Sequence, residues 1–298
     1  MATIARRAVD LTDTALAVSS TRDRAVLRRF LERDRLRAAY ALCDLDQREF
    51  PKTKWGIATR RGETVAVVLE YMGLTPQPML VMGETDGIVE ILRQVIRPRL
   101  VYLAADVAHL PAVELLYRIE PGPPMIRMVV DRQTFRPHSG VALRLLPVEI
   151  GDLNRLYGYG FTAWLPGEAI ANGVYYGIRE GGRLVAAAGT HVISAEVGLA
   201  AVGNVMTHPD YRGRGYARLT TSAVTQELLR TCDEVVLNVR SDNPPAIAAY
   251  RALGYREHAT FEERLARRRG AGWDSIVSGL RHLYSRLRPA SPSPQEPA

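Results

Sequence analysis

The sequence predicts an α/β protein built from two copies of one fold. Apolar runs of strand length alternate with segments of helical spacing in the first half. The length of 298 residues also favours two domains. A short pattern occurs twice: Gly56-Ile57 precedes G-x-x-V-A at 62–66, and Gly177-Ile178 precedes the same pattern at 182–186. Because both copies lie in a hairpin context, we interpret them as a repeat.

The composition is that of a soluble globular chain with ample core, at 47% hydrophobic and 24% charged residues. Lys plus Arg exceeds Asp plus Glu, 39 against 32, giving a net charge of +7. The basic residues are scattered, and nearly all are Arg. The run 265–269 carries no aromatic interleaving, so we expect a solvated face there and no nucleic-acid partner.

The ends of the chain and its cysteines indicate location and redox state. Residues 1–20 lack a continuous apolar core, and no stretch approaches the roughly 18 apolar residues of a membrane span. We therefore expect a cytoplasmic protein with no membrane contact. Cys43 and Cys232 form no metal or disulfide pattern, which predicts free core thiols and no metal site.

The elements of the first half follow from periodicity and turn signals. One or two helices are expected within 21–45, and the hairpin turn lies at 60–63. The remaining predicted elements are strands at 55–59, 64–71, 79–82 and 100–104 and a helix at 87–96.

The second half begins after a predicted linker at 132–140, which contains Pro137 and Ser139. An aromatic, glycine-rich loop is expected at 157–164, and the last residues, 289–298, read as a disordered tail. The predicted strands are 141–146, 174–178, 184–194, 199–207, 235–239 and 258–263, with a turn at 196–198 and helices at 150–157, 219–229 and 273–287.

An anion-binding site is predicted where the strand ending at Val205, Met206 and Thr207 leads to a helix through a glycine-containing loop. A strand, a loop and a helix start place several unpaired N–H groups at the positive end of a helix dipole. Gly213 and Gly215 carry no Cβ that would keep a phosphate away from these amides. The P-loop pattern fails here, and so does the dinucleotide pattern, which needs glycine where Arg218 stands.

The loop does fit R-x-x-G-x-A, with Arg212, Gly215 and Ala217 in place, and here the sequence resembles the GNAT superfamily of acyl-CoA-dependent N-acyltransferases. A second match follows, N-x-x-A-x-x-x-Y-x-x-x-G-F/Y, at Asn243, Ala246, Tyr250 and Gly254-Tyr255. The resemblance implies that the loop binds the pyrophosphate of coenzyme A and that Asn243 binds its pantetheine arm. The cofactor-binding residues that it implies are Val205, Met206, Thr207, Arg212, Gly213, Arg214, Gly215, Tyr216, Ala217 and Asn243.

The resemblance also implies a mixed, mostly antiparallel central sheet flanked by helices, in two tandem domains. Residues 1–136 look like a degenerate copy, because Glu84 and Asp86 bring carboxylates where an anion site needs arginine. Residues 137–288 are the expected catalytic domain with a C-terminal helix, followed by the tail at 289–298.

The implied reaction is transfer of an acetyl group from acetyl-CoA to a primary amine by direct attack. Tyr250 is the implied general acid, because a phenol is still protonated at neutral pH. Glu196 and His191 are both candidates for the base, and the choice stays open. We expect a small-molecule or peptide amine as acceptor. A homodimer is one possible assembly. The alternative is a regulatory module that binds acyl-CoA without turnover.

Overall fold

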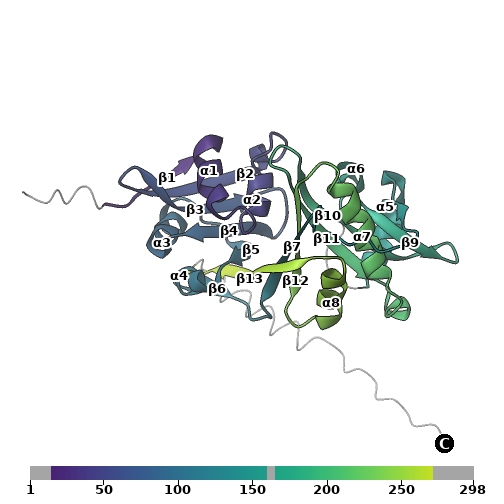
Figure 1. Cartoon of the computed structure of the whole chain (residues 1–298). Helices are drawn as coiled ribbons and strands as arrows, with labels where there is room; N and C mark the ends of the chain where they lie inside the picture. Colours follow the sequence, from purple (N-terminus) through teal and green to yellow (C-terminus); the bar gives the residue numbers. More distant parts are fainter. Residues whose placement is uncertain (1–14, 160–164, 271–298) are drawn as a thin grey trace, which may run out of the picture.

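The computed structural model describes residues 15–159 and 165–270. Within these residues the strands form one 13-stranded sheet, in the order β1-β2-β3-β4-β5-β13-β7-β12-β11-β10-β9-β8, with β6 paired to β13 (Figure 1). The strands of the first half are β1 (Ala17–Thr21), β2 (Thr53–Arg60), β3 (Glu63–Tyr71), β4 (Gln77–Gly83), β5 (Leu100–Ala105), β6 (Tyr117–Ile119) and β7 (Met125–Asp131). Those of the second are β8 (Leu143–Arg144), β9 (Tyr176–Glu180), β10 (Arg183–Ser194), β11 (Leu199–Thr207), β12 (Glu234–Arg240) and β13 (Arg256–Arg268).

Helices flank both parts of the sheet. The first half carries α1 (Arg24–Leu31), α2 (Ala39–Cys43), α3 (Thr85–Gln94) and α4 (Leu110–Glu114). The second carries α5 (Ile150–Tyr157), α6 (Glu168–Asn172), α7 (Tyr216–Leu228) and α8 (Pro244–Ala252). In the described ranges no helix is both long and apolar enough to cross a membrane.

The two halves repeat the same order of elements, as the sequence repeat predicts. In each half an antiparallel hairpin leads to a strand that pairs in parallel with the strand after the next helix: β4 with β5, and β11 with β12. The other strand pairs of the described sheet are antiparallel. The prediction of a mixed, mostly antiparallel sheet with flanking helices is confirmed.

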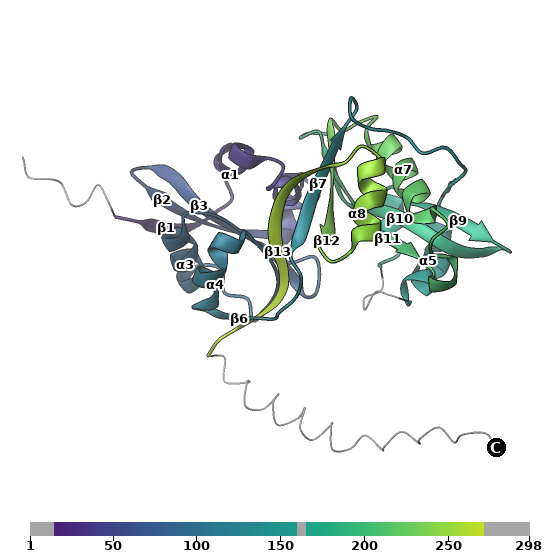
Figure 2. The same ribbon diagram turned by 60° about the horizontal axis from the view of Figure 1, so that its bottom comes forward.

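The last strand of each half joins the sheet of the other half. β7 pairs with β12, from Met125↔Arg240 to Asp131↔Glu234, and β13 pairs with β5, from Ala105↔Glu262 to Leu100↔Arg267. Between them β7 and β13 pair with each other, and Figure 2 shows both strands in the middle of the molecule. The predicted boundary at residue 136 therefore does not separate the two sheets, because β7 precedes it.

Helices α1 and α2 fill the space between the two parts of the sheet. Their buried residues, including Leu27 and Leu42, share one apolar cluster with Trp55 on β2 and with Leu199 and Val236 on β11 and β12. The opposite face of the C-terminal part carries α7 and α8, whose buried residues Val224 and Ile247 belong to a second cluster. The N-terminal half thus packs directly on the sheet of the C-terminal half.

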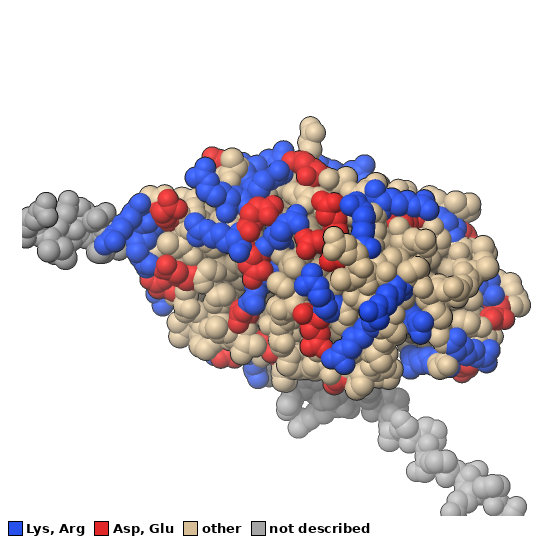
Figure 3. Space-filling model, viewed as in Figure 1, with Lys and Arg blue, Asp and Glu red and all other residues tan. Residues whose placement is uncertain are grey.

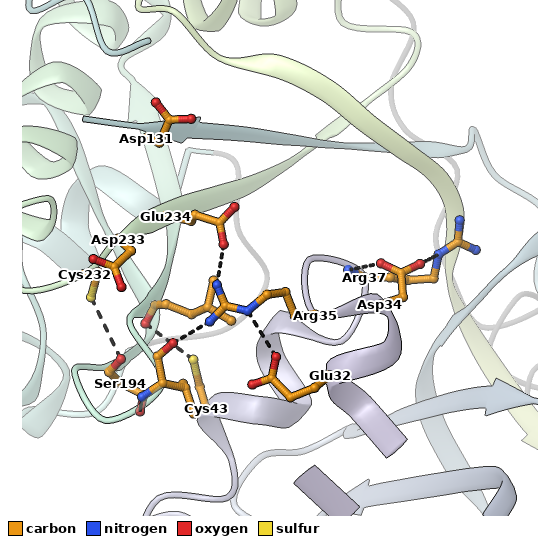
Figure 4. A network of polar contacts seen from close by, with 12 residues as sticks. Glu32, Asp34, Arg35, Arg37, Cys43, Asp131, Ser194, Cys232, Asp233 and Glu234 are labelled. Carbon is orange, nitrogen blue, oxygen red and sulfur yellow. Dashed lines mark hydrogen bonds and ion pairs between the residues drawn. The ribbon is translucent and has the colours of Figure 1, made fainter. Parts of the chain in front are cut away.

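Polar contacts anchor this packing next to α2 (Figure 4). The Arg35 guanidinium donates to Glu234 at 2.5 Å, to the Val197 carbonyl at 2.6 Å and to Glu32 at 3.2 Å. Cys43 donates to the Leu199 carbonyl at 3.6 Å. Both cysteines are buried and free, which confirms the predicted core thiols.

Some predicted elements differ from the structure. The strand expected at 141–146 is only the two-residue β8. The run at 265–269 is not a solvated connection: β13 extends to Arg268 and pairs with β5 and β6, and Ala266 is fully buried. Strands β1, β6 and β7 were missed. The helix at 273–287, the tail at 289–298 and residues 160–164 of the aromatic loop lie outside the described residues.

Candidate functional site

The C-terminal half contains a point where two parallel neighbours separate. β11 pairs with β12 from Leu199↔Glu234 to Val202↔Leu237, and no pairing continues from there among the described residues. β11 runs on to Thr207. β12 runs on to Arg240 and pairs there with β7 on its other edge. The edge of β11 that faces β12 is therefore open at residues 203–207, where an extended amide chain could pair with it as an added strand.

A β-bulge accompanies this separation. Asn204 has a φ of 53°, and the register between β10 and β11 shifts between Ala187↔Met206 and Gly189↔Gly203. A bulge bends its strand and increases the local twist, which turns residues 205–207 of β11 away from β12. The local backbone of β11 thus produces the opening.

The loop after β11 joins the strand to the start of α7 through two glycines, as the sequence predicts. Gly213 and Gly215 both have a φ of 78°, and Gly215 is the N-cap residue of α7. A Cβ built on either glycine would meet no atom of the described residues within 4 Å, so these residues leave the space in front of the loop open. The first amides of an α-helix have no partner within the helix, and those of α7 begin here. The buried His208 accepts from the Asp210 amide at 3.3 Å, which stabilises the turn around Pro209.

The arginines of the loop are oriented by weak local contacts. Arg212 donates to the Thr207 carbonyl at 3.4 Å, and the Arg214 guanidinium lies 4.9 Å from the centre of the Tyr211 ring. The Tyr216 hydroxyl donates to Glu180. On the face drawn in Figure 3, basic and acidic side chains are interspersed, so the net charge of +7 forms no single basic surface there. The charge that matters for an anion is local to the loop.

Tyr250 and Asn243 lie on the other side of the opening, on and before α8. Tyr250 is 6% exposed and belongs to an apolar cluster with Val239 of β12, against which Val205 of β11 also packs. Burial raises the pKa of Tyr250 to about 12, and its hydroxyl makes none of the hydrogen bonds found in the described part of the chain. The Asn243 side chain accepts from the Ala246 amide at 3.3 Å and thereby caps α8. A protonated phenol thus stands in the cluster that borders the opening.

His191, on β10, lies directly over the bulge. A Cβ built on Gly203 would come within 2.2 Å of the His191 ring, so only glycine leaves room for the ring there. Its Nε2 is 3.2 Å from Asn204 Oδ1, and its Nδ1 is 3.0 Å from the Tyr40 hydroxyl. The ring is exposed to solvent, yet the protein around it desolvates the cation and lowers the pKa of His191, which the Asn204 hydrogen bond opposes. His191 is therefore neutral at pH 7.

A set of tyrosines that sequence reasoning missed holds this histidine and the bulge. The side-chain nitrogen Nδ2 of Asn204 donates to the Tyr175 hydroxyl at 3.1 Å, and Tyr175 donates to the Thr190 carbonyl at 3.1 Å. Tyr157 donates to the Asn204 carbonyl at 2.6 Å. Nothing local marks Tyr40 as part of the site, because it reaches His191 only through the packing of α2 on the C-terminal sheet.

Glu196, the other candidate base, is placed elsewhere. It lies in the turn before β11 and forms ion pairs with Arg24, at 3.5 Å, and with Arg28. The hydrogen bond from Arg28 lowers the pKa of Glu196. At about 3.3 Å per residue, four residues of β11 put its opening about 13 Å beyond Leu199, where the strand begins. Its ion pairs make Glu196 a link between the two halves, at the end of β11 that lies away from the opening.

The N-terminal half has a counterpart of the opening without a counterpart of the loop. β4 pairs with β5 up to Leu80↔Ala104 and then runs on to Gly83. A cavity of about 220 Å³ lies at this separation. The helix α3 follows almost at once, and Arg60 forms ion pairs with Glu84 and, at 2.6 Å, with Asp86. Carboxylates therefore occupy the start of α3.

Comparisons with known proteins agree with this geometry. Residues 149–255 match the model of the Acetyltransferase (GNAT) family. The chain is 40% identical over 55 residues to an acetyltransferase of Yersinia pestis, which covers 18% of the chain and 39% of that protein. It is 36% identical over 82 residues to an acetyltransferase of Yersinia enterocolitica, covering 22% of the chain and 58% of that protein. The chain thus spans less than two thirds of the length of these relatives.

A solved structure resembles both halves together. A tandem GNAT protein from the clavulanic acid biosynthesis pathway superposes with a TM-score of 0.52 at 15% identity, covering 86% of this chain and 99% of that one. At this identity the likeness concerns the fold alone. It agrees with the tandem arrangement that the sequence repeat predicts.

Proposed function

We propose that the protein transfers an acetyl group from acetyl-CoA to a primary amine of a small-molecule or peptide acceptor, because residues 149–255 match the model of the Acetyltransferase (GNAT) family. The observation that carries the proposal is the continuity between two features. The open edge of β11 at residues 203–207 leads directly into the glycine loop at the start of α7. An extended amide arm that ends in a pyrophosphate fits this arrangement.

The loop would hold the pyrophosphate and β11 the pantetheine arm. Each charge-assisted hydrogen bond from an amide to a phosphate contributes about 1.5–3 kcal/mol, so several at 213–217 give micromolar affinity. The arm would pair with Val205, Met206 and Thr207. The side-chain nitrogen of Asn243, Nδ2, makes no hydrogen bond within the described ranges, so it can donate to the arm while Oδ1 caps α8. A backbone N–H on β11 would polarise the thioester carbonyl.

Tyr250 would protonate the departing thiolate. The amine attacks the thioester carbon, the tetrahedral intermediate collapses, and the C–S bond breaks. A thiol resembling cysteine has a pKa of about 8.5, so the released coenzyme A is mostly thiol at pH 7. Tyr250 would give its proton to the sulfur as the C–S bond breaks, and the resulting phenolate, the stronger base, would regain a proton from water. Tyr250 stays protonated because burial raises its pKa to about 12.

His191 would be the base. An alkylammonium has a pKa of about 10.4, so the acceptor must lose protons in the course of the reaction. His191 is neutral and solvent-exposed, and it lies over the bulge where the thioester would sit. Glu196 lacks this placement, so we assign the role to His191 alone.

The experiment that tests the function is an amine panel with acetyl-CoA, read by release of free thiol. The panel would hold amino acids, polyamines, aminoglycosides and peptides with free amino termini or lysines. Thiol release that depends on one amine class, and is absent in Gly215→Val, is expected. Binding of acetyl-CoA with no release for any amine would instead favour a regulatory module without turnover.

A further inference from the structure

Tyr40, a residue of the N-terminal half, covers the opening in the C-terminal half. Its hydroxyl reaches His191 on β10, and the Arg127 guanidinium on β7 lies 5.1 Å from its ring centre. Arg127 in turn donates to Asn238 of β12 at 3.0 Å. In the sheet order, β10 and β7 flank β11 and β12. A side chain that contacts both flanking strands therefore lies over the pair between them, where that pair separates.

The direction of each hydrogen bond around His191 follows from one carbonyl. The Thr190 carbonyl can only accept, so the Tyr175 hydroxyl donates to it and accepts from the Asn204 amide nitrogen. Asn204 Oδ1 then faces His191 Nε2 and accepts from it. Neutral His191 thus carries its proton on Nε2, and its Nδ1 lone pair accepts from the Tyr40 hydroxyl. The opposite amide orientation would leave the Tyr175 hydroxyl facing two acceptors with one proton.

Both ring nitrogens of His191 are therefore engaged by the protein. An amine at the opening cannot reach the Nδ1 lone pair, because Tyr40 already donates to it. The Tyr40 oxygen keeps a free lone pair, and Tyr40 is only partly buried. The hydroxyl of Tyr40 is thus the group through which His191 can receive a proton.

We propose that the acceptor amine gives its proton to Tyr40, which passes its own proton to His191. This relay rests on the proposed transferase function. It builds the acceptor side of that site from residues of both halves, Tyr40 and His191. The amine N–H bond breaks as a new O–H bond forms on Tyr40. The original Tyr40 O–H bond breaks as an N–H bond forms on His191 Nδ1. The resulting imidazolium keeps its Nε2–H bond to Asn204 and later loses the Nδ1 proton to water through Tyr40.

The first test measures the relay in the transfer reaction. Tyr40→Phe keeps the ring over Arg127 and removes only the hydroxyl. We expect its kcat/KM to fall by about 10²-fold or more, as for loss of a general base. The kcat/KM of His191→Gln should fall to the same level. The kcat/KM of the double variant should be no lower, because each single change already breaks the same proton path. Tyr71→Phe is the matched control: it also loses one hydroxyl of the N-terminal half, which donates to Glu49 at 2.6 Å, and should stay within a few-fold of the unchanged chain.

The second test needs no turnover. In the full chain with ¹⁵N-labelled histidine, assigned with the help of His191→Gln, neutral His191 should show the Nε2–H form. Its Nδ1 resonance should move in Tyr40→Phe and stay in Tyr71→Phe. A proton on Nδ1 of the neutral ring, or an Nδ1 resonance unchanged by Tyr40→Phe, would overturn the relay.

The outcomes separate this inference from the function on which it rests. Transfer that survives Tyr40→Phe within 10-fold, or losses that multiply in the double variant, would overturn the relay and leave the transferase intact. Absence of thiol release with every amine would overturn the transferase and the relay with it. Equal, non-multiplying losses together with the Nε2–H form would support both.

Discussion

The two halves contain the same strand, loop and helix unit, and only one of them is open to an anion. β4 and β11 both separate from a parallel neighbour, after Leu80 and Val202 respectively. In the N-terminal unit, a Cβ on Gly83 would come within 2.2 Å of the Val65 carbonyl, and α3 starts two residues later. In the C-terminal unit, the longer loop at 208–215 leaves free space in front of its glycines. The strands separate in both units, so the two units differ in the loop that follows the separation.

Charge reinforces this difference. The N-terminal unit places Glu84 and Asp86 at the start of its helix, both paired with Arg60. Acidic residues at a helix N-terminus stabilise the helix, and they occupy the positive potential that a phosphate would need. The C-terminal unit has Arg212 and Arg214 at the corresponding place. The N-terminal copy thus uses its helix dipole for stability, and the C-terminal copy leaves it free for a ligand.

The largest expected effect comes from closing the open loop. Gly215→Val places a branched side chain in the space of the phosphates and strains a φ of 78°. Acetyl-CoA binding, measured by calorimetry, should be lost while the thermal transition stays cooperative. The matched control is Gly62→Val in the N-terminal hairpin, where φ is 77° and a Cβ also meets nothing within 4 Å. It should carry a similar strain and bind acetyl-CoA normally, and an equal loss in both variants would contradict the assignment.

The next effect concerns chemistry rather than binding. Tyr250→Phe should lower kcat by about 10²- to 10⁴-fold through loss of a general acid, with acetyl-CoA affinity within a few-fold. Steady-state kinetics and calorimetry on the same protein separate the two quantities. Tyr255→Phe is the control, because its hydroxyl bonds Thr225 at 2.7 Å and should affect stability only. A loss of affinity with unchanged kcat in Tyr250→Phe would mean that the hydroxyl only positions the cofactor.

Removing one loop charge should have a smaller effect. Arg212→Ala removes one charge-assisted contact and should weaken acetyl-CoA binding by about 1–3 kcal/mol, which is roughly 5- to 150-fold. Arg60→Ala makes the corresponding change in the N-terminal unit. The acetyl-CoA affinity of Arg60→Ala should stay the same. Weaker acetyl-CoA binding in both variants would contradict the proposed difference between the two copies.

The smallest predicted effect is that of a change in pH near neutrality on kcat/KM. The groups bonded to His191 are the uncharged Tyr40 from α2 and Asn204 from β11. The surrounding protein desolvates the cation and lowers the pKa of His191 below its ordinary value of about 6.5. The base must be neutral, so kcat/KM should be constant near pH 7. It should fall only below pH 6.5, as His191 becomes protonated. A pH profile for His191→Gln that keeps the same acid limb would assign the limb to another group.

The parts of the molecule that the sequence predicts are those set by local rules. The glycine loop and the hairpins follow from neighbouring residues, and the structure has them where they were expected, although α7 begins at Tyr216, three residues before the predicted start. The exchange of β7 and β13 does not, because it depends on pairing between residues 125–131 and 234–240 and between 100–105 and 262–267. The basic run at 265–269 was therefore taken for surface.

The base illustrates the same limit. His191 and Glu196 lie five residues apart, and the sequence could not separate them. The distinction comes from packing: Gly203 lets the His191 ring lie on the bulge, whereas Arg24 and Arg28 of α1 hold Glu196 at the other end of the strand. The contact between Tyr40 and His191, on which the proposed relay rests, also comes from this packing. Contacts between the halves therefore decide which polar residues can act.

The most direct test of the central claim is the stoichiometry of acetyl-CoA binding to the full chain by isothermal titration calorimetry. If only the C-terminal loop accepts the pyrophosphate, the unchanged protein should bind one molecule per chain, and Gly215→Val should bind none. Two molecules per chain, or one molecule retained by Gly215→Val, would show that the N-terminal copy also binds the cofactor and would contradict the account.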